Sequence, residues 1–458
     1  MRQEHKNGGA RARWGRWPHL GIGLLALSLV GCDPDELTDL TDPDEITPQV
    51  AADTANINEL RNGVLYEFAR AMTGTAGNNQ TPGIIGISGL LADEMWFSST
   101  FQSMQEIDRR NIERTNGDVL AVFQFLHRSR NLAERTIEQY ATTSRNNTAD
   151  HAMVTNLAGF TYVMFAENFC SGVPFSRTQL TGDVTFGAAL TTAQMLDSAV
   201  TRFAAAATRA TAANSSQQLN LARVGRGRAL LARGDFAGAA AAVAAVPDTF
   251  VYNVVYSANS SGQNNGVWYN INSERRSSVA SGEGTNGIVF FRRGPTGNTI
   301  DPRAPADSLG AGIGTTTPHY RQRKYATLNA PVQLASGTEA RLIQAEAALN
   351  KGQSAAYLTT LNQLRTAQGM TALTDPGNAQ GRVRQFFQER AFWLWLTAHR
   401  LGDMRRMVRE YGFSQAQVFP VGQTIFGSPY GTDVNFPIPV TEQNNPEAPS
   451  GECINRNA

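Results

Sequence analysis

Residues 221–246 read LARVGRGRALLARGDFAGAAAAVAAV, and this segment sets the architecture of the chain. Apolar residues recur at helical spacing over residues 221–232, and Gly234-Asp235 provides a turn. Residues 236–246 form a second, Ala-rich segment that stops at Pro247. Small residues on both sides of the turn allow two helices to approach closely. The segment therefore predicts a helical hairpin.

A second hairpin of similar size is predicted after Thr338. Residues 342–349 carry one apolar stripe, Lys351-Gly352 interrupts it, and residues 357–364 carry the next. Two such units predict tetratricopeptide-type packing, although the full consensus of that repeat is missing. Residues 383–408 are expected to form one long helix. The expected fold class is mainly α, with tetratricopeptide-type helical hairpins and long irregular loop insertions.

The sequence between and around the hairpins divides the chain into parts. Residues 250–331 are rich in Gly, Ser, Asn and Thr, and long segments of this kind are usually functional or disordered. The expected parts are a signal peptide (1–31), an acidic, Pro- and Thr-containing tether (32–55), an N-terminal helical part (56–250), a loop-rich insertion (251–337) and a C-terminal part (338–458).

The N-terminal residues predict export. The first 19 residues carry five basic residues against one acidic residue, and an apolar run follows over residues 20–30. That run is too short to span a bilayer, which needs about 20 residues. Residues 29–32 read LVGC and resemble the lipobox of bacterial lipoproteins, whose cysteine, here Cys32, is acylated. A lipid anchor is the interpretation that we favour over an ordinary signal peptide with a chance cysteine.

The other two cysteines, Cys170 and Cys453, would then share an oxidising compartment. An even pair there favours a disulfide, and the alternative is two unrelated buried thiols. Three cysteines are too few for a closed zinc site, and the six histidines show no metal-ligand spacing. Neither a metal nor another cofactor is expected.

No pattern predicts catalysis. Residues 282–287 read GEGTNG and match a dinucleotide fingerprint, but they lack a strand before them and a helix after them, so a flexible turn is expected. Asp93 and Glu94 are adjacent, and adjacent side chains on a helix point apart. The 40 basic residues nearly balance the 39 acidic ones, so nucleic acid is not an expected partner. We expect a protein that is not an enzyme.

Several motifs in order resemble the SusD/RagB family. Residues 389–392 read ERAF and residues 399–406 read HRLGDMRR, similar to the family's C-terminal helix motif. Residues 339–347 (EARLIQAEA) and 435–439 (NFPIP) resemble two further family motifs. Residues 91–94 (LADE) match near the N-terminus, so the resemblance covers nearly all of the mature chain.

The resemblance implies a SusD-like fold and a function in nutrient uptake. Such a protein is a lipoprotein of the outer membrane that faces the exterior, binds a glycan or another nutrient, and delivers it to a SusC-like TonB-dependent transporter. One alternative is a structural tetratricopeptide-type lipoprotein that assembles envelope machinery. Another is a surface glycan hydrolase, which predicts a pair of carboxylates across a cleft.

The charged motif residues have two interpretations, a ligand site or a structural charge network, and we favour the network. On one helix His399 and Asp403 would share a face, and Arg400 and Arg405 would reach carboxylates such as that of Glu346. The residues concerned are Glu346, Glu389, Arg390, His399, Arg400, Asp403 and Arg405.

Ligand contacts are predicted where aromatic and polar residues occur together, because sugar rings stack on aromatic faces and polar side chains bind hydroxyl groups. The alternative for each aromatic residue is that it anchors its loop to the core. The candidates are Trp96, Phe97, Trp268, Tyr269, Tyr320 and Arg321.

Overall fold

The computed structural model describes residues 56–458, apart from residues 78–79, 180–181, 295–296 and 450–452. The predicted signal peptide, Cys32 and the predicted tether lie outside the described residues. Within the described part, no helix combines the length and apolar character needed to cross a bilayer.

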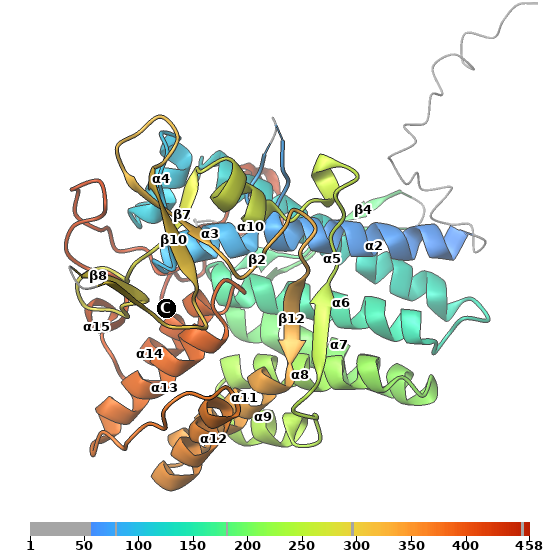
Figure 1. Ribbon diagram of the computed structural model, residues 1–458. Helices are drawn as coiled ribbons and strands as arrows, with labels where there is room; N and C mark the ends of the chain where they lie inside the picture. Colours follow the sequence, from blue (N-terminus) through green and yellow to red (C-terminus); the bar gives the residue numbers. More distant parts are fainter. Residues whose placement is uncertain (1–55, 78–79, 180–181, 295–296, 450–452) are drawn as a thin grey trace, which may run out of the picture. The chain divides into compact units, whose positions relative to one another are not determined.

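The described residues are mainly α-helical, as predicted (Figure 1). The α-helices are α2 (Ile57–Thr73), α3 (Ile84–Leu91), α4 (Gln102–Asp108), α5 (Gly117–Ala141), α6 (Ala149–Asn168), α7 (Thr192–Ala212), α8 (Ser216–Ala232), α9 (Phe236–Val243), α10 (Gly266–Trp268), α11 (Gly337–Asn350), α12 (Ser354–Ala367), α13 (Ala379–Trp393), α14 (Arg400–Tyr411) and α15 (Gln415–Val418).

The strands are short and pair two by two, antiparallel. The pairs are β1 (Met95–Phe97) with β7 (Ser277–Val279), β2 (Val173–Pro174) with β5 (Ala189–Leu190), β3 (Arg177–Thr178) with β4 (Val184–Thr185), β6 (Val251–Val254) with β12 (Val332–Ser336), β8 (Phe291–Gly294) with β9 (Gly297–Ile300), and β10 (Ala306–Ala311) with β11 (Pro318–Gln322).

Both predicted hairpins are present. The first consists of α8 and α9, joined at Gly234, which has a φ of 83° that favours glycine. The second consists of α11 and α12, and α11 packs against α8 and α9. Successive helical hairpins therefore stack on one another, as in tetratricopeptide-type packing.

Glycines allow the close packing of the central helices. The ring of Phe203 on α7 lies against Gly159 of α6 and Gly225 of α8, where an added Cβ would come within 2.8 Å and 2.2 Å of it. At Gly227 an added Cβ would come within 2.5 Å of the side chain of Val243 on α9. The small residues of segment 221–246 thus serve helix contacts on two sides of α8.

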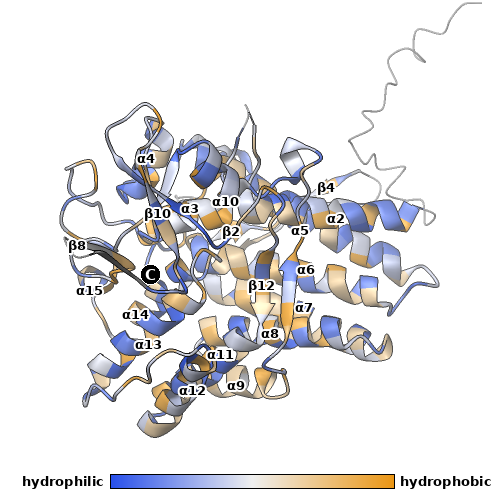
Figure 2. Ribbon diagram, in the orientation of Figure 1, coloured by the Kyte–Doolittle hydropathy of each residue, from blue (hydrophilic) through white to orange (hydrophobic). Residues whose placement is uncertain are grey.

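The core is continuous, but its helices differ in composition. Helix α6 is buried on almost every side, because it packs against α5, α7 and α8. Apolar residues are dense along α3 and α6, whereas α13 and α14 carry many hydrophilic residues (Figure 2). Much of α13 and α14 is nevertheless buried, so their charged side chains must find partners inside the protein.

The single helix predicted over residues 383–408 is wrong. Helix α13 ends at Trp393 and α14 begins at Arg400, and between them Leu396 and Ala398 have φ values of 55° and 61°. Side chains from distant segments hold this linker, since the Tyr325 hydroxyl donates to the carbonyl of Leu396 at 2.8 Å. Tertiary contacts have overridden a local pattern that favours a helix.

The insertion also contains more regular structure than a loop. Strands β6 to β12 lie within it, and β7 pairs with β1 of the N-terminal part. Residues 282–287 form a turn, as predicted, and Gly282 bridges to Val289. The insertion is therefore integrated with the helical part through strand pairing.

Candidate functional site

Strand β1 sends the predicted candidates Trp96 and Phe97 to opposite faces, since consecutive side chains alternate along a strand. Trp96 is only 9% exposed, and its indole N–H donates to the carbonyl of Pro318 at 2.9 Å. Its ring contacts Tyr320 edge to face, with centroids 5.6 Å apart. Trp96 therefore joins β1 to β11.

Tyr320 and Arg321 are separated in the same way along β11. The ring of Tyr320 contacts Phe291 at 5.0 Å as well as Trp96, which extends the aromatic cluster. Arg321 is exposed and forms an ion pair with Asp307 of β10 at 3.1 Å. The structure therefore brings Tyr320 to Trp96 but leaves Arg321 on the outside of the β10–β11 hairpin.

The other face of β1 leads to an exposed aromatic ring. Phe97 is buried and stacks on Phe101, with centroids 6.2 Å apart. Phe101 is 47% exposed, and the guanidinium of Arg276 lies 4.5 Å from its ring centroid. The sequence offered one signal for Phe101 that we did not use, namely a large apolar residue between polar ones in residues 98–102.

A recess opens beside this ring. Met95, Phe97 and Met104 supply apolar walls, and Asn270 and Arg276 are among its polar residues. Its volume is about 40 Å³, too small for a sugar ring. A ligand at this surface would therefore lie over Phe101, with polar neighbours at the edge. We call the surface formed by Phe101, Arg276 and Asn270 the Phe101 platform.

Trp268 and Tyr269 do not line this recess. Trp268, at the end of α10, is partly buried and packs against the core. Tyr269 begins the short π-helix η3 (Tyr269–Ser273), and its hydroxyl donates to Glu274 at 2.9 Å. The next two residues, Asn270 and Ile271, do contribute to the recess. The predicted groups are thus distributed over three places.

A serine and a histidine lie together near β1, but their bonds are structural. Ser98 Oγ lies 2.8 Å from His319 Nδ1, and His319 Nε2 lies 2.8 Å from the carbonyl oxygen of Ile271. Both side chains are buried, and burial lowers the pKa of His319 to about 4. A neutral histidine whose second nitrogen donates to a carbonyl joins β1, β11 and η3.

The charged residues of α13 and α14 form an interior network. Arg390 donates to both oxygens of Asp403 at 2.9 Å, and Arg406 bonds Asp403 at 2.8 Å and Glu346 at 2.5 Å. These side chains are at most 2% exposed. Burial alone would raise the pKa of Asp403, but Arg390 and Arg406 outweigh it and lower the pKa to about 2.

Arg400 forms a two-bond pair with a carboxylate, as expected, but with Glu283 and not Glu346, whereas the expectation for Arg405 was wrong. Arg400 donates to Glu283, and Arg405 donates to the carbonyls of Ala166 and Phe169 at 2.9 Å and 3.2 Å. Glu346 is bonded by Arg406 instead. Because α14 begins at Arg400 rather than continuing α13, the direction of every side chain on it differs from that in one continuous helix.

His399 and Glu389 join further segments to this region. His399 Nε2 lies 3.0 Å from Glu339 of α11, and Glu389 pairs with Arg303 and Arg365. All seven predicted motif residues are buried. The motif residues are therefore shielded from a ligand in solution.

Throughout the described chain, no three His, Cys, Asp or Glu residues are grouped so that they could hold a metal ion.

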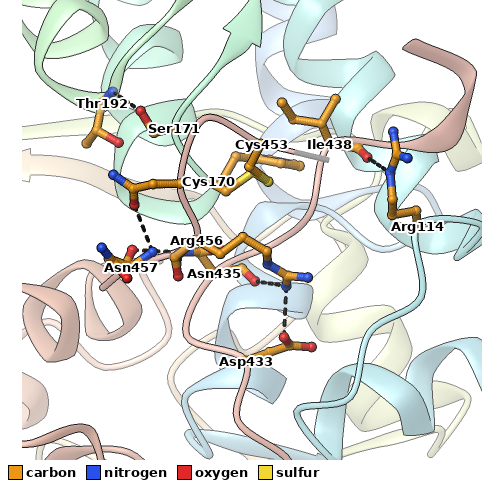
Figure 3. Close-up of a disulfide and its surroundings, with 12 residues drawn as sticks. Arg114, Cys170, Ser171, Thr192, Asp433, Asn435, Ile438, Cys453, Arg456 and Asn457 are labelled. Carbon is orange, nitrogen blue, oxygen red and sulfur yellow. Dashed lines mark hydrogen bonds and ion pairs between the residues drawn. A yellow bond between two sulfur atoms is a disulfide. The ribbon is translucent and has the colours of Figure 1, made fainter. Parts of the chain in front are cut away.

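Cys170 and Cys453 form a disulfide (Figure 3). It joins the C-terminal tail to the segment after α6, where Ser171 bridges Asn455. The side-chain amide of Asn435 donates to the carbonyls of Arg456 and Asn457, each at 2.9 Å. The tail is therefore held covalently and by hydrogen bonds.

Comparisons with known proteins agree with this architecture. The SusD family model matches residues 338–442. A SusD-like carbohydrate binding protein from Bacteroides fragilis NCTC 9343 is 18% identical, with a TM-score of 0.62 over 87% of this chain and 99% of that chain. A SusD superfamily protein from Bacteroides vulgatus ATCC 8482 is 15% identical, with a TM-score of 0.62 over 86% and 97%.

A third solved structure, surface glycan-binding protein A from Bacteroides uniformis, is 14% identical, with a TM-score of 0.61 over 85% of this chain and 97% of that chain. A search of curated proteins finds no match. At these identities the structural comparisons show a shared fold. The family model adds a match in amino-acid sequence over residues 338–442. Residues 338–442 thus match the SusD family model, and the chain shares the fold of SusD-like proteins, in agreement with its ordered motifs.

Proposed function

We propose that the protein is a lipoprotein on the outer face of the outer membrane that binds a glycan and delivers it to a SusC-like TonB-dependent transporter. The task needs binding and release but no chemical step. The lipobox at Cys32 supports the anchor. The similar structures from B. fragilis and B. uniformis are a carbohydrate binding protein and a surface glycan-binding protein, which supports the ligand class.

The observation that carries the glycan proposal is the Phe101 platform. An exposed phenyl ring, backed by Phe97 and flanked by Arg276 and Asn270, offers an apolar face together with hydrogen-bond donors. A sugar ring presents an apolar CH face and polar hydroxyl groups, so both kinds of contact are available. A ring that served only the core would be buried, as Phe97 is.

The transporter partnership is tested by purifying the native lipoprotein from gently solubilised outer membranes. An affinity tag belongs in the exposed turn at Gly377 and not at the C-terminus, because Ala458 is buried and its tail is tied by the disulfide. We expect a TonB-dependent barrel to be recovered in stoichiometric amount. A second tag, at exposed Asn146, controls for obstruction by the first.

Other outcomes would redirect the assignment. Recovery of the lipoprotein alone with both tags, in several mild detergents, would contradict delivery to a transporter. Recovery with envelope-assembly components would favour the structural alternative. Hydrolysis of a bound polysaccharide would favour the hydrolase alternative.

A further inference from the structure

A groove much larger than the recess at Phe101 lies beside α2. Its lining comes from α2, α6, the start of α8, strand β6 and the segment that contains the 3-10 helix η2 (Ser261–Gln263). Its volume is about 640 Å³, within the usual range of about 300–1,000 Å³ for small-ligand sites. None of the ligand residues predicted from the sequence lines it.

The lining is uncharged and combines apolar with polar side chains. Among the described residues that line the groove there is no Asp, Glu, Lys, Arg or His. Leu65, Phe68, Met153 and Leu157 supply apolar surface. Its polar side chains include six amides, those of Asn62, Gln217, Gln218, Asn253, Asn259 and Gln263. Amides both donate and accept hydrogen bonds, as hydroxyl groups do.

An exposed tyrosine ring lines one side of the groove. Tyr66 of α2 is 37% exposed, and its hydroxyl lies so close to Gly262 that a Cβ there would come within 2.5 Å of it. The absence of a side chain at Gly262 therefore gives the Tyr66 ring its place. Tyr256 fixes the facing segment, because its hydroxyl donates to the carbonyl of Ala69 at 3.1 Å.

The buried end of the amide group is also tied in place. Gln218 is 7% exposed, and Asn156 donates to its side-chain oxygen at 3.2 Å and to its backbone carbonyl at 3.0 Å. The side-chain carbonyl of Asn156 is itself buried without a hydrogen-bond partner. Part of the polar lining is thus fixed before any ligand arrives, which lowers the entropy cost of binding.

We propose that this groove is a second carbohydrate site, selective for uncharged oligosaccharides. The inference rests on the proposed function, since it assigns the groove a ligand of the same general class. A sugar ring would stack on Tyr66, and its hydroxyls would bond the amides. A uronate or sulfated sugar would lose hydration in this uncharged lining, and the cation beside it, Arg61 on Asn62, is already paired with Asp150, so a charged sugar is disfavoured.

Titration calorimetry on the native lipoprotein in detergent tests the proposal. The probes are maltoheptaose, cellohexaose, xylohexaose and mannohexaose, with hexagalacturonate as the charged counterpart and an uncharged Ser/Asn decapeptide as the peptide probe. We expect Tyr66→Ala to weaken binding of at least one neutral oligosaccharide by about tenfold. Tyr66→Phe, which keeps the ring, should change that affinity by less than about twofold.

A second variant protects against an indirect effect of losing the ring. Gly262→Ala retains Tyr66 but places a methyl group where its hydroxyl lies, so the ring must move. It should weaken binding of the same oligosaccharide. Phe186→Ala removes an exposed ring that does not line the groove, so it is the control and should leave this affinity unchanged. Phe101→Ala reports on the separate platform.

Three results would overturn the second site. The first is that the titration curves of Tyr66→Ala and Gly262→Ala do not differ from those of wild type. The second is that hexagalacturonate or the peptide binds in preference to every neutral oligosaccharide. The third is that none of the four neutral probes binds. If only Phe101→Ala weakens binding, the groove assignment fails while the proposed function stands. The transporter pull-down tests that function independently of either surface.

Discussion

Arg400 and Glu283 form a two-bond ion pair in the interior, with N–O distances of 2.5 Å and 2.6 Å, although 117 residues separate them. Glu283 lies in the turn of residues 282–287, and Arg400 is the first residue of α14. The pair therefore fixes the insertion to the C-terminal part. It also explains why a charged residue within a glycine-rich turn is fully buried.

Replacement of Arg400 should be severely destabilising. Arg400→Met leaves the Glu283 carboxylate buried without its cation, so we expect the free energy of unfolding to fall by about 3–5 kcal/mol. Arg400→Met with Glu283→Gln should recover part of the loss. Arg321→Met, which removes an exposed ion pair with Asp307, should cost less than about 1 kcal/mol. Urea unfolding measures all three, and equal losses for the two single variants would contradict this reading.

Loss of the disulfide should lower stability and free the tail. The double variant Cys170→Ser, Cys453→Ser removes a link between residues 283 apart in sequence, and we expect a loss of about 2–5 kcal/mol by chemical unfolding. Reduction should lower the stability of the wild-type protein by a similar amount and leave that of the double variant unchanged, which is the control. A non-reduced proteolytic digest should contain the Cys170–Cys453 peptide pair. Two free thiols in the native protein would contradict the bond.

Glu94 should make stability depend on pH. Burial raises the pKa of Glu94 to about 8, so the folded protein holds a proton that the unfolded chain, with an ordinary carboxyl pKa of 4.5, has released. Glu94 alone should therefore lower stability as pH rises from about 5 to 8, by at most about 1.4 kcal/mol per pH unit. Glu94→Gln keeps an acceptor for the Leu396 N–H and removes the contribution of Glu94 to the slope. Asp93, whose pKa burial raises to about 7, keeps its own contribution, so the slope should become smaller and not vanish.

The test of this pH dependence requires unfolding curves of wild type and of Glu94→Gln at several pH values. Glu59→Gln, at an exposed position of α2, is the control and should leave the pH dependence of wild type intact. Parallel curves for wild type and Glu94→Gln between pH 5 and 8 would show that Glu94 does not carry the effect.

Phe101 and Trp96 should have opposite effects on affinity and stability. Phe101→Ala removes an exposed ring of the Phe101 platform. The affinity for a glycan bound at that platform should therefore fall by about tenfold, with little change in stability. Trp96→Ala removes a buried ring that bonds Pro318, so stability should fall by about 3–5 kcal/mol. Calorimetric titration and urea unfolding separate the two effects. If Trp96→Ala were stable and failed to bind, the ligand surface would lie on the other face of β1.

Local patterns in the sequence predicted much of the helical scaffold. The hairpin over residues 221–246 was predictable because helical periodicity, a turn at Gly234 and a stop at Pro247 all lie within one short segment. The helix break at residues 394–399 was not, since the residues there favour a helix and the groups that hold it, such as Tyr325, come from another part of the chain.

The candidate ligand surfaces were also only partly predictable from local sequence. Aromatic residues in polar segments marked the region of β1 and β11, but strand alternation then separated Trp96 from Phe97. Tyr66 was missed because it lies within an ordinary helical pattern, and its neighbours in the groove come from β6 and η2. The sequence alone determined the helical hairpins, the family motifs and which charged residues were available to form the interior network. Only the tertiary structure decided which carboxylate meets which arginine and which rings remain exposed, because those contacts join residues far apart in the chain.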